Sequence, residues 1–122
     1  MAQEISELRP DICVIGAGAG GLAAAAAAAA MGVPVVLIEK GRVGGQSLYA
    51  GSVPSKALLA AAAHASAMQD GARFGIKNVR FGVDFAAVSA RVRGAIAAIA
   101  PQYSAERFAG LGVRIVTGTG RF

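Results

Sequence analysis

An apolar run, a glycine cluster, an alanine run and a second apolar run follow one another near the start of this chain. Their order restricts the possible folds more than any other feature. The apolar runs Asp11–Ile15 and Val35–Ile38 have the length and composition of strands that are buried on both faces. Between them, Leu22–Ala30 consists of one leucine and eight alanines and predicts a helix. Strand, turn, helix and strand in this order predict an α/β fold with a parallel sheet.

The glycines between the first predicted strand and the predicted helix have a recognisable spacing. Gly16, Gly18 and Gly21 form a Gly-x-Gly-x-x-Gly motif. In this context the first glycine permits a tight turn, the second lets the backbone approach a pyrophosphate, and the third allows close packing of helix on strand. Glu39 follows the second predicted strand, where its carboxylate can accept hydrogen bonds from ribose hydroxyls. The motif predicts a site for FAD or NAD; a glycine turn without a ligand is the alternative.

Composition and charge favour a packed domain over other classes. The chain has 122 residues, 55% of them hydrophobic, and a formal net charge of +5. Its basic residues are scattered, so we expect no nucleic-acid partner. The uncharged stretch between Asp11 and Glu39 is long enough for a membrane span, but its glycines and weakly apolar alanines oppose one, and we expect no membrane association. Acidic residues near the N-terminus oppose a signal peptide.

The chain has one cysteine and one histidine, so neither a disulfide framework nor a metal site is expected. Cys13 lies in the first predicted strand, and we interpret it as a small core residue. His64 lies in a predicted helix and is interpreted as a surface residue. This cysteine usage is typical of a reducing cytoplasm.

The remaining segments predict helices and a third strand. A helix is predicted over residues 54–69, and Asp84 has the position of an N-cap for the next helix. Pro101 predicts a kink or a restart in a helical stretch that continues to Phe108, and Val113–Val116 predicts a strand. The predicted packing face of the first of these helices is Leu58, Leu59, Ala62, Ala63 and Ser66, and that of the second is Phe85, Val88, Val92, Ile96 and Ile99.

Residues 43–56 read Val-Gly-Gly-Gln-Ser-Leu-Tyr-Ala-Gly-Ser-Val-Pro-Ser-Lys. This stretch resembles the redox-disulfide motif of the class I pyridine nucleotide-disulfide oxidoreductases, which runs Gly-Gly-x-Cys, four residues, Cys-x-Pro-Ser-Lys. The resemblance extends from Asp11 to Phe122. It implies a Rossmann-like FAD/NAD(P)-binding domain with a parallel sheet, incomplete relative to the family, in which this N-terminal part binds FAD. NAD(P)H would bind only in a complete parent protein.

The resemblance also implies which residues bind FAD. Glu39 would hold the adenosine ribose, and Gln46 would lie near the pyrophosphate. Lys56 would approach the flavin near N5, where an ammonium group stabilises the negative charge of reduced flavin. The implied cofactor-binding residues are Gly16, Gly18, Gly21, Glu39, Lys40, Gly44, Gly45, Gln46, Lys56, Thr119 and Gly120.

The same stretch departs from the family at the reacting positions. Ser47 and Ser52 stand where the family has its two redox cysteines. A hydroxyl group cannot form a disulfide or act as the attacking thiolate, so we assign no catalytic residue and expect no disulfide reductase activity. Tyr49 and Ala50 also differ from the family's usual residues, which favours natural divergence over an engineered change. As an N-cap, Ser52 would have a structural role instead.

We expect a flexible tail over residues 1–10 and the N-terminal part of an FAD-binding domain over residues 11–122. The expected function is that of the FAD-binding portion of a flavin-dependent oxidoreductase. The alternative is a non-catalytic dinucleotide-binding module that pairs with separately encoded domains. FAD is the expected ligand. Because further sheet partners are missing, we also expect either self-association or docking with the remaining domains of a larger oxidoreductase.

Overall fold

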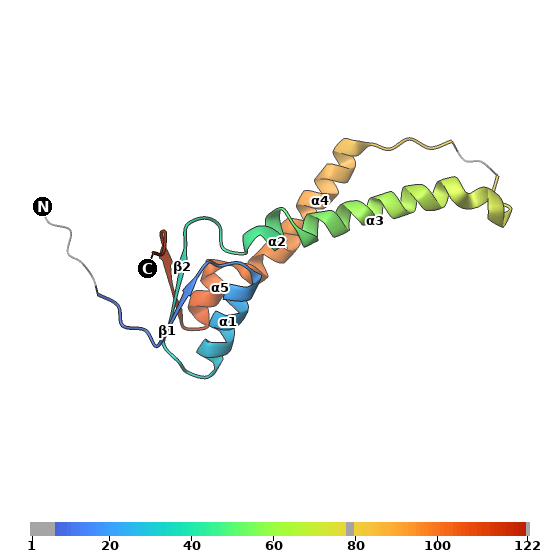
Figure 1. The fold of residues 1–122 in the computed structure, drawn as a ribbon. Coiled ribbons are helices and arrows are strands. Elements are labelled where there is room, and N and C mark those ends of the chain that lie inside the picture. The colour runs from blue at the N-terminus through green and yellow to red at the C-terminus, as the bar shows by residue number, and fades with distance from the viewer. Residues whose placement is uncertain (1–6, 78–79, 122) are drawn as a thin grey trace, which may run out of the picture. The chain divides into compact units, whose positions relative to one another are not determined.

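The computed structural model describes residues 7–77 and 80–121, and the chain divides into two units (Figure 1). The first unit combines the residues up to Gly45 with those from Gln102 onward, and the second comprises Gln46–Pro101. The first unit has the predicted α/β fold with a parallel sheet, and the second is helical. Part of the predicted tail, residues 1–6, lies outside the described residues, and residues 7–10 have no regular secondary structure.

The first unit is built on a three-stranded parallel sheet. Strands β1 (Ile12–Ile15), β2 (Val35–Glu39) and β3 (Val113–Thr117) lie in the order β1-β2-β3. The register pairs Val14 with Leu37 and Leu37 with Ile115. All three strands were predicted within one residue of their observed ends. The sheet places the carboxyl ends of all three strands at one edge, where ligands bind in open α/β sheets.

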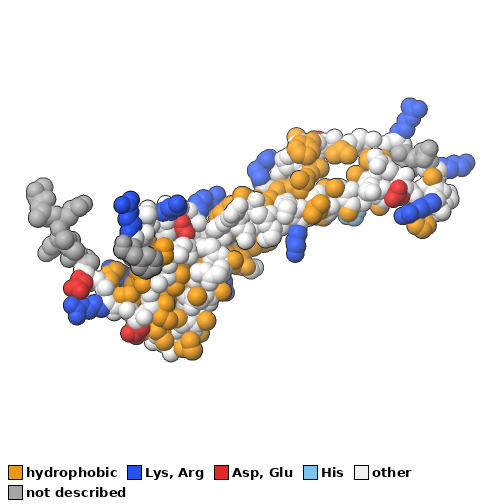
Figure 2. Space-filling model, viewed as in Figure 1, with side chains coloured by type: hydrophobic (Ala, Val, Ile, Leu, Met, Phe, Trp, Pro, Cys, Tyr) orange, Lys and Arg blue, Asp and Glu red, His pale blue; other side chains and the backbone are white. Residues whose placement is uncertain are grey.

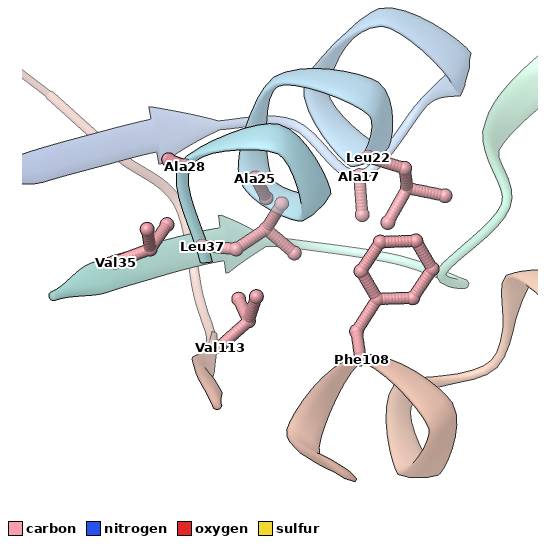
Figure 3. Close-up of a cluster of buried hydrophobic side chains, with 8 residues drawn as sticks. All are labelled: Ala17, Leu22, Ala25, Ala28, Val35, Leu37, Phe108 and Val113. Carbon is pink, nitrogen blue, oxygen red and sulfur yellow. The ribbon is translucent and has the colours of Figure 1, made fainter. Parts of the chain in front are cut away.

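One face of this sheet packs against helices α1 (Ala19–Ala30) and α5 (Ala105–Gly110). Figure 3 shows the resulting cluster, in which the Phe108 side chain points from α5 toward Leu22 and Leu37. The fully buried members include alanines of α1, so the helix axis can approach the sheet closely. The buried cluster comprises Ala17, Leu22, Ala25, Ala28, Val35, Leu37, Phe108 and Val113.

The opposite face of the sheet is much less covered. Because successive side chains alternate across a strand, this face carries Cys13, Ile15, Ile38, Arg114 and Val116, together with Val36. Cys13 is exposed and Ile15 is 47% exposed. The prediction that β1 is buried on both faces, with Cys13 in the core, was therefore wrong. In the described part of the chain β1 is an outer strand, and both α1 and α5 pack on the other face.

The second unit is a pair of packed helices, α3 (Ser52–Gln69) and α4 (Phe85–Ile99), preceded by the short helix α2 (Gly45–Tyr49). None of the residues in α3 or α4 is buried, and Figure 2 shows hydrophobic side chains at their surface. The longest helix, α3, has 18 residues. No helix within residues 7–77 and 80–121 combines the length and the apolar character that a membrane span requires.

The packing faces predicted for these two helices were only partly right. In α3, Leu58, Leu59 and the other predicted members are exposed, and the partly buried positions are instead Val53, Pro54, Ala57, Ala61 and Ala65. Small residues occur all around α3, so the sequence does not distinguish its faces. In α4, Phe85 is 66% exposed, whereas Val88, Val92, Ile96 and Ile99 are partly buried as the stripe predicted.

Side-chain caps define the helix starts on either side of Pro101. Asp84 caps α4 as predicted, accepting a hydrogen bond from the backbone N–H of Ala87 at 3.1 Å. Helix α4 is followed by the 3₁₀ helix η2 (Ala100–Tyr103). A new helix, α5, then begins after its N-cap Ser104, whose hydroxyl accepts a hydrogen bond from the N–H of Arg107 at 3.2 Å. Of the two outcomes predicted for Pro101, the structure shows the restart. Another 3₁₀ segment, η1 (Asp70–Phe74), ends the run that begins with α3.

Candidate functional site

The turn between β1 and α1 uses its glycines for close approaches. Gly16 has φ = +97°, which only glycine adopts readily, and its N–H donates to the carbonyl of Ile38 at 2.8 Å. A Cβ on Gly21 would lie 2.0 Å from the carbonyl oxygen of Gly16, so the start of α1 packs directly on the turn. A Cβ on Gly18 would meet no described atom within 4 Å. The turn therefore leaves open space where the motif requires an approaching pyrophosphate.

The glycine pair at residues 44 and 45 lies against the same turn. The N–H of Gly44 donates to the carbonyl of Ala17 at 2.9 Å. A Cβ on Gly45 would lie 2.6 Å from the Cα of Gly18, and the φ of Gly45 is +66°. Gly45 is thus needed where two backbone segments approach closely, and Gly44 has φ = +114°, which favours glycine. The resemblance implied these two residues only as a lining of the FAD groove.

Glu39, at the carboxyl end of β2, connects the glycine turn after β1 with the loop after β2 through hydrogen bonds to its carboxylate. Its Oε2 accepts from the N–H of Ala17 at 2.6 Å, and its Oε1 accepts from the N–H of Gly41 at 2.8 Å. The bond from Ala17 and then that from Gly41 hold the pKa of the Glu39 carboxyl below its ordinary value, against a smaller opposing effect of desolvation. Each oxygen retains capacity for a further hydrogen bond. Glu39 can therefore hold the glycine turn and still accept a ligand hydroxyl.

The lowered pKa predicts an acid-sensitive contribution to stability. Since the folded-state pKa of Glu39 lies below its ordinary value of 4.5, the contribution is fully present above pH 4.5 and is lost as the pH falls through the folded-state pKa. Glu39→Gln should remove it, so the variant should be less stable than the wild type near neutral pH, with the gap narrowing in acid. Urea unfolding at several pH values would measure this.

The control for this experiment is Glu7→Gln, because the Glu7 side chain is 70% exposed and its ion-pair partner among the described residues is the exposed Arg9. That variant should behave as the wild type at every pH. A stability gap for Glu39→Gln that stays constant from neutral to acid pH would contradict the role assigned to the ionised carboxylate.

A cavity of about 280 Å³ opens at the carboxyl edge of the sheet. Glu39 and Lys40 line it beside Gly16, and Thr119 and Gly120 line it from the segment after β3. The N–H of Gly118 donates to the backbone carbonyl of Glu39 at 2.9 Å and holds that segment in place. Five of the predicted cofactor residues thus share one cavity, although the first and the last of them, Gly16 and Gly120, are 104 positions apart in the sequence.

Sequence reasoning missed several residues at this cavity. Ile15, Ile38 and Gly118 also line it, and the backbone of Ala17 is the partner of Glu39. The positions of Ile15 and Ile38 at the ends of two parallel strands could have indicated their place at this edge. Nothing in the residue type of Ala17 indicated its bond to Glu39, because the donor is a backbone group.

The other predicted residues lie in the second unit. Gln46 and Ser47 belong to α2, whereas Ser52 and Lys56 lie in the first turns of α3. The prediction that Ser52 caps α3 was wrong: Gly51 holds the cap position without a side-chain bond, and the Ser52 hydroxyl donates to the carbonyl of Ser47 at 3.4 Å. This weak contact links the two positions that the resemblance assigns to redox cysteines.

The histidine and cysteine give no metal site in the described part of the chain. His64 is exposed on α3 and Cys13 is exposed on β1. No group of three or more His, Cys, Asp or Glu side chains among residues 7–77 and 80–121 is placed to hold a metal ion.

Comparison with known proteins identifies the family to which this chain belongs. Residues 10–100 match the sequence model of a family described as "Pyridine nucleotide-disulphide oxidoreductase", whose members bind FAD. The chain is 39% identical to a mercuric reductase of Streptomyces lividans over 113 residues, which are 92% of this chain and 24% of that protein. It is 40% identical to a dihydrolipoyl dehydrogenase of Geobacillus stearothermophilus over 81 residues, or 66% of this chain and 17% of that protein. The chain therefore spans about a quarter of the length of these relatives, or less.

Proposed function

Because this chain belongs to the pyridine nucleotide-disulphide oxidoreductase family and matches its FAD-binding region, we propose that it supplies the FAD-binding part of a flavin-dependent pyridine nucleotide oxidoreductase that works without a redox disulfide. One observation carries the proposal: the Glu39 carboxylate holds the glycine turn and also lines the cavity formed with Thr119 and Gly120. A carboxylate at the end of the second strand, beside a Gly-x-Gly-x-x-Gly turn, is the arrangement that binds the ribose of a dinucleotide.

The residues at the cavity fit the adenosine end of FAD. A volume of about 280 Å³ suits part of a dinucleotide rather than the whole of it. The free acceptor capacity of Glu39 matches the ribose hydroxyls, and the backbone around Gly18 leaves room for phosphates. Lys40, which also lines the cavity, adds positive charge near this end. When bound, FAD would supply the capacity to accept and pass on a hydride; the protein would supply binding and orientation.

The flavin end is assigned from the family resemblance. Lys56 would approach the flavin near N5, and Gln46 would lie near the pyrophosphate. At the two positions next to the flavin, Ser47 and Ser52 offer hydroxyls that cannot exchange with a disulfide. The complete protein would therefore pass electrons to an acceptor that is not a disulfide.

A second candidate function is a non-catalytic dinucleotide-binding module that pairs with other domains. The contact between the Ser52 hydroxyl and the backbone carbonyl of Ser47 favours it, because it gives the Ser52 side chain a structural use. Self-association of the chain is proposed as well, through the sheet face that carries Cys13 and Ile15. Exposed apolar strand surfaces with unpaired edges are suited to pairing with another chain.

FAD titration of Glu39→Gln tests the proposed binding site. The amide cannot accept from both N–H groups or carry the charge, so FAD should bind more weakly by ~1–3 kcal/mol, roughly five- to 150-fold in Kd. Binding is followed by quenching of flavin fluorescence. Glu106→Gln is the matched control, since Glu106 is exposed on α5 and does not line the cavity.

Two results would count against the proposal in different ways. Equal FAD affinity for Glu39→Gln and the wild type would remove Glu39 from the site. If the wild-type chain binds neither FAD, nor riboflavin, nor adenosine nucleotides, the function proposed for this chain is contradicted.

A further inference from the structure

The segment after α3 carries a surface that is both apolar and basic. Phe74, the last residue of η1, is 73% exposed, and Ile76 is 57% exposed. Lys and Arg side chains gather at this end of the second unit (Figure 2). We define the η1 surface by the exposed residues Met68, Arg73, Phe74, Ile76, Lys77 and Arg80. Exposed apolar side chains with a polar rim mark interaction sites.

Backbone hydrogen bonds hold the turn that carries this surface. The N–H of Gly75 donates to the carbonyl of Ala72, and the N–H of Ile76 donates to the carbonyl of Gly71, both at 3.1 Å. Gly71 is buried, and a Cβ on it would lie 3.2 Å from the Cβ of Ile76. The exposed Phe74 therefore belongs to a hydrogen-bonded turn, which a partner need not order before binding it.

The charge of the η1 surface is mainly positive. Arg73 forms an ion pair with Asp70 at 3.7 Å, and its guanidinium lies 5.0 Å from the centroid of the Phe74 ring. Within residues 7–77 and 80–121, neither Lys77 nor Arg80 forms an ion pair. Cations beside exposed apolar side chains suit a partner that combines negative charge with an apolar phase.

We propose that the η1 surface binds the surface of a bilayer that contains anionic phospholipids. Lys77 and Arg80 would contact the phosphate groups, and Phe74 and Ile76 would enter the boundary between headgroups and acyl chains. A second copy of this chain is a poorer partner, because it would bring the same cations together. A specific protein partner normally engages about 20–30 residues on each side, far more than this surface offers.

This contact differs from the membrane span against which the sequence argues. It needs no membrane-spanning helix, and it lies outside the uncharged stretch between Asp11 and Glu39. None of the residues to which FAD binding is assigned belongs to the η1 surface. The inference therefore stands or falls separately from the proposed function.

A single introduced tryptophan tests whether Phe74 enters the lipid, because the chain contains no tryptophan of its own. Phe74→Trp keeps an aromatic side chain, and Phe85→Trp is the matched control at a residue that is 66% exposed at the start of α4. Vesicles of phosphatidylglycerol and phosphatidylcholine should shift the emission of Phe74→Trp to shorter wavelengths, and lipids brominated on their acyl chains should quench it. Phe85→Trp should show neither change, and vesicles of phosphatidylcholine alone should affect neither variant.

Co-sedimentation with the same vesicles tests the role of charge. Lys77→Gln and Arg80→Gln should each lower the partition coefficient of the chain roughly fivefold. Arg93→Gln is the control, because this exposed residue of α4 lines a cavity with Gly51 and Phe85 and is not part of the η1 surface. It should bind as the wild type does, and added salt should weaken the binding of the wild type.

Two results would overturn the proposal. Equal losses for Arg80→Gln and Arg93→Gln would assign vesicle binding to net charge rather than to this surface. Binding of Phe74→Trp without a wavelength shift or quenching would show a purely electrostatic contact, as expected of a surface for an acidic protein.

Discussion

Gly21→Ala should destabilise the first unit by ~2–4 kcal/mol, whereas Gly20→Ala, one residue earlier in the same helix, should leave stability unchanged or raise it by up to ~1 kcal/mol. A Cβ on Gly21 would lie 2.0 Å from the Gly16 carbonyl oxygen and 3.1 Å from the Val14 Cγ1. The first contact is with backbone, which cannot swing away as a side chain can. A Cβ on Gly20 would meet no described atom within 4 Å.

Urea unfolding followed by circular dichroism would measure both variants. The midpoint should fall for Gly21→Ala and hold or rise for Gly20→Ala, with similar slopes if the unfolding mechanism is unchanged. Most single domains have a stability of ~5–15 kcal/mol, so the expected loss is a large part of the total. Equal midpoints for the two variants would contradict the close packing of α1 on the glycine turn.

The chain should self-associate as its concentration rises, and Cys13→Lys should shift it toward the monomer. Cys13 is exposed on the outer strand β1, on the sheet face that also carries Ile15 and Val116. A lysine on an edge strand opposes pairing with another strand, because its charge would have to be desolvated. The formal charge of +5 opposes association only weakly at physiological salt, where the screening length is ~8 Å.

Sedimentation equilibrium over a concentration series, with reductant present, would follow this change. Met31→Lys is the matched control, because it adds the same charge at a residue that is 74% exposed at the C-terminal end of α1. It should associate as the wild type does. A wild-type chain that stays monomeric at high concentration would contradict the prediction, and an equal response of the two lysine variants would assign the effect to net charge.

Local signals in the sequence predicted much of the fold. The strand, turn, helix and strand of the first unit follow from apolar runs, glycine spacing and alanine propensity, which act over a few residues each. The Asp84 cap was predicted for the same reason, and it is confirmed. The position of β3 followed from its alternating apolar residues, whereas its pairing with β2 is known from the structure.

Burial was predicted less well, because it depends on which elements meet. The sequence alone could not say that the helices packed on the sheet would share one face, and so it placed Cys13 in the core. It could not choose a contact face for α3, where alanine occurs on every side. For the candidate site, the sequence indicated Glu39 as a ligand of ribose, but its bonds to Ala17 and Gly41 come from backbone groups that residue types do not reveal.

The exposed thiol on β1 also provides a chemical probe of the sheet. Because the chain has a single cysteine, any thiol-directed reagent reacts at one known position, Cys13, on the open face of the sheet. The rate of its alkylation therefore measures the accessibility of that face and falls when another chain or domain covers it. One unaltered side chain thus serves as a built-in label for following assembly, without a tag or an added dye site.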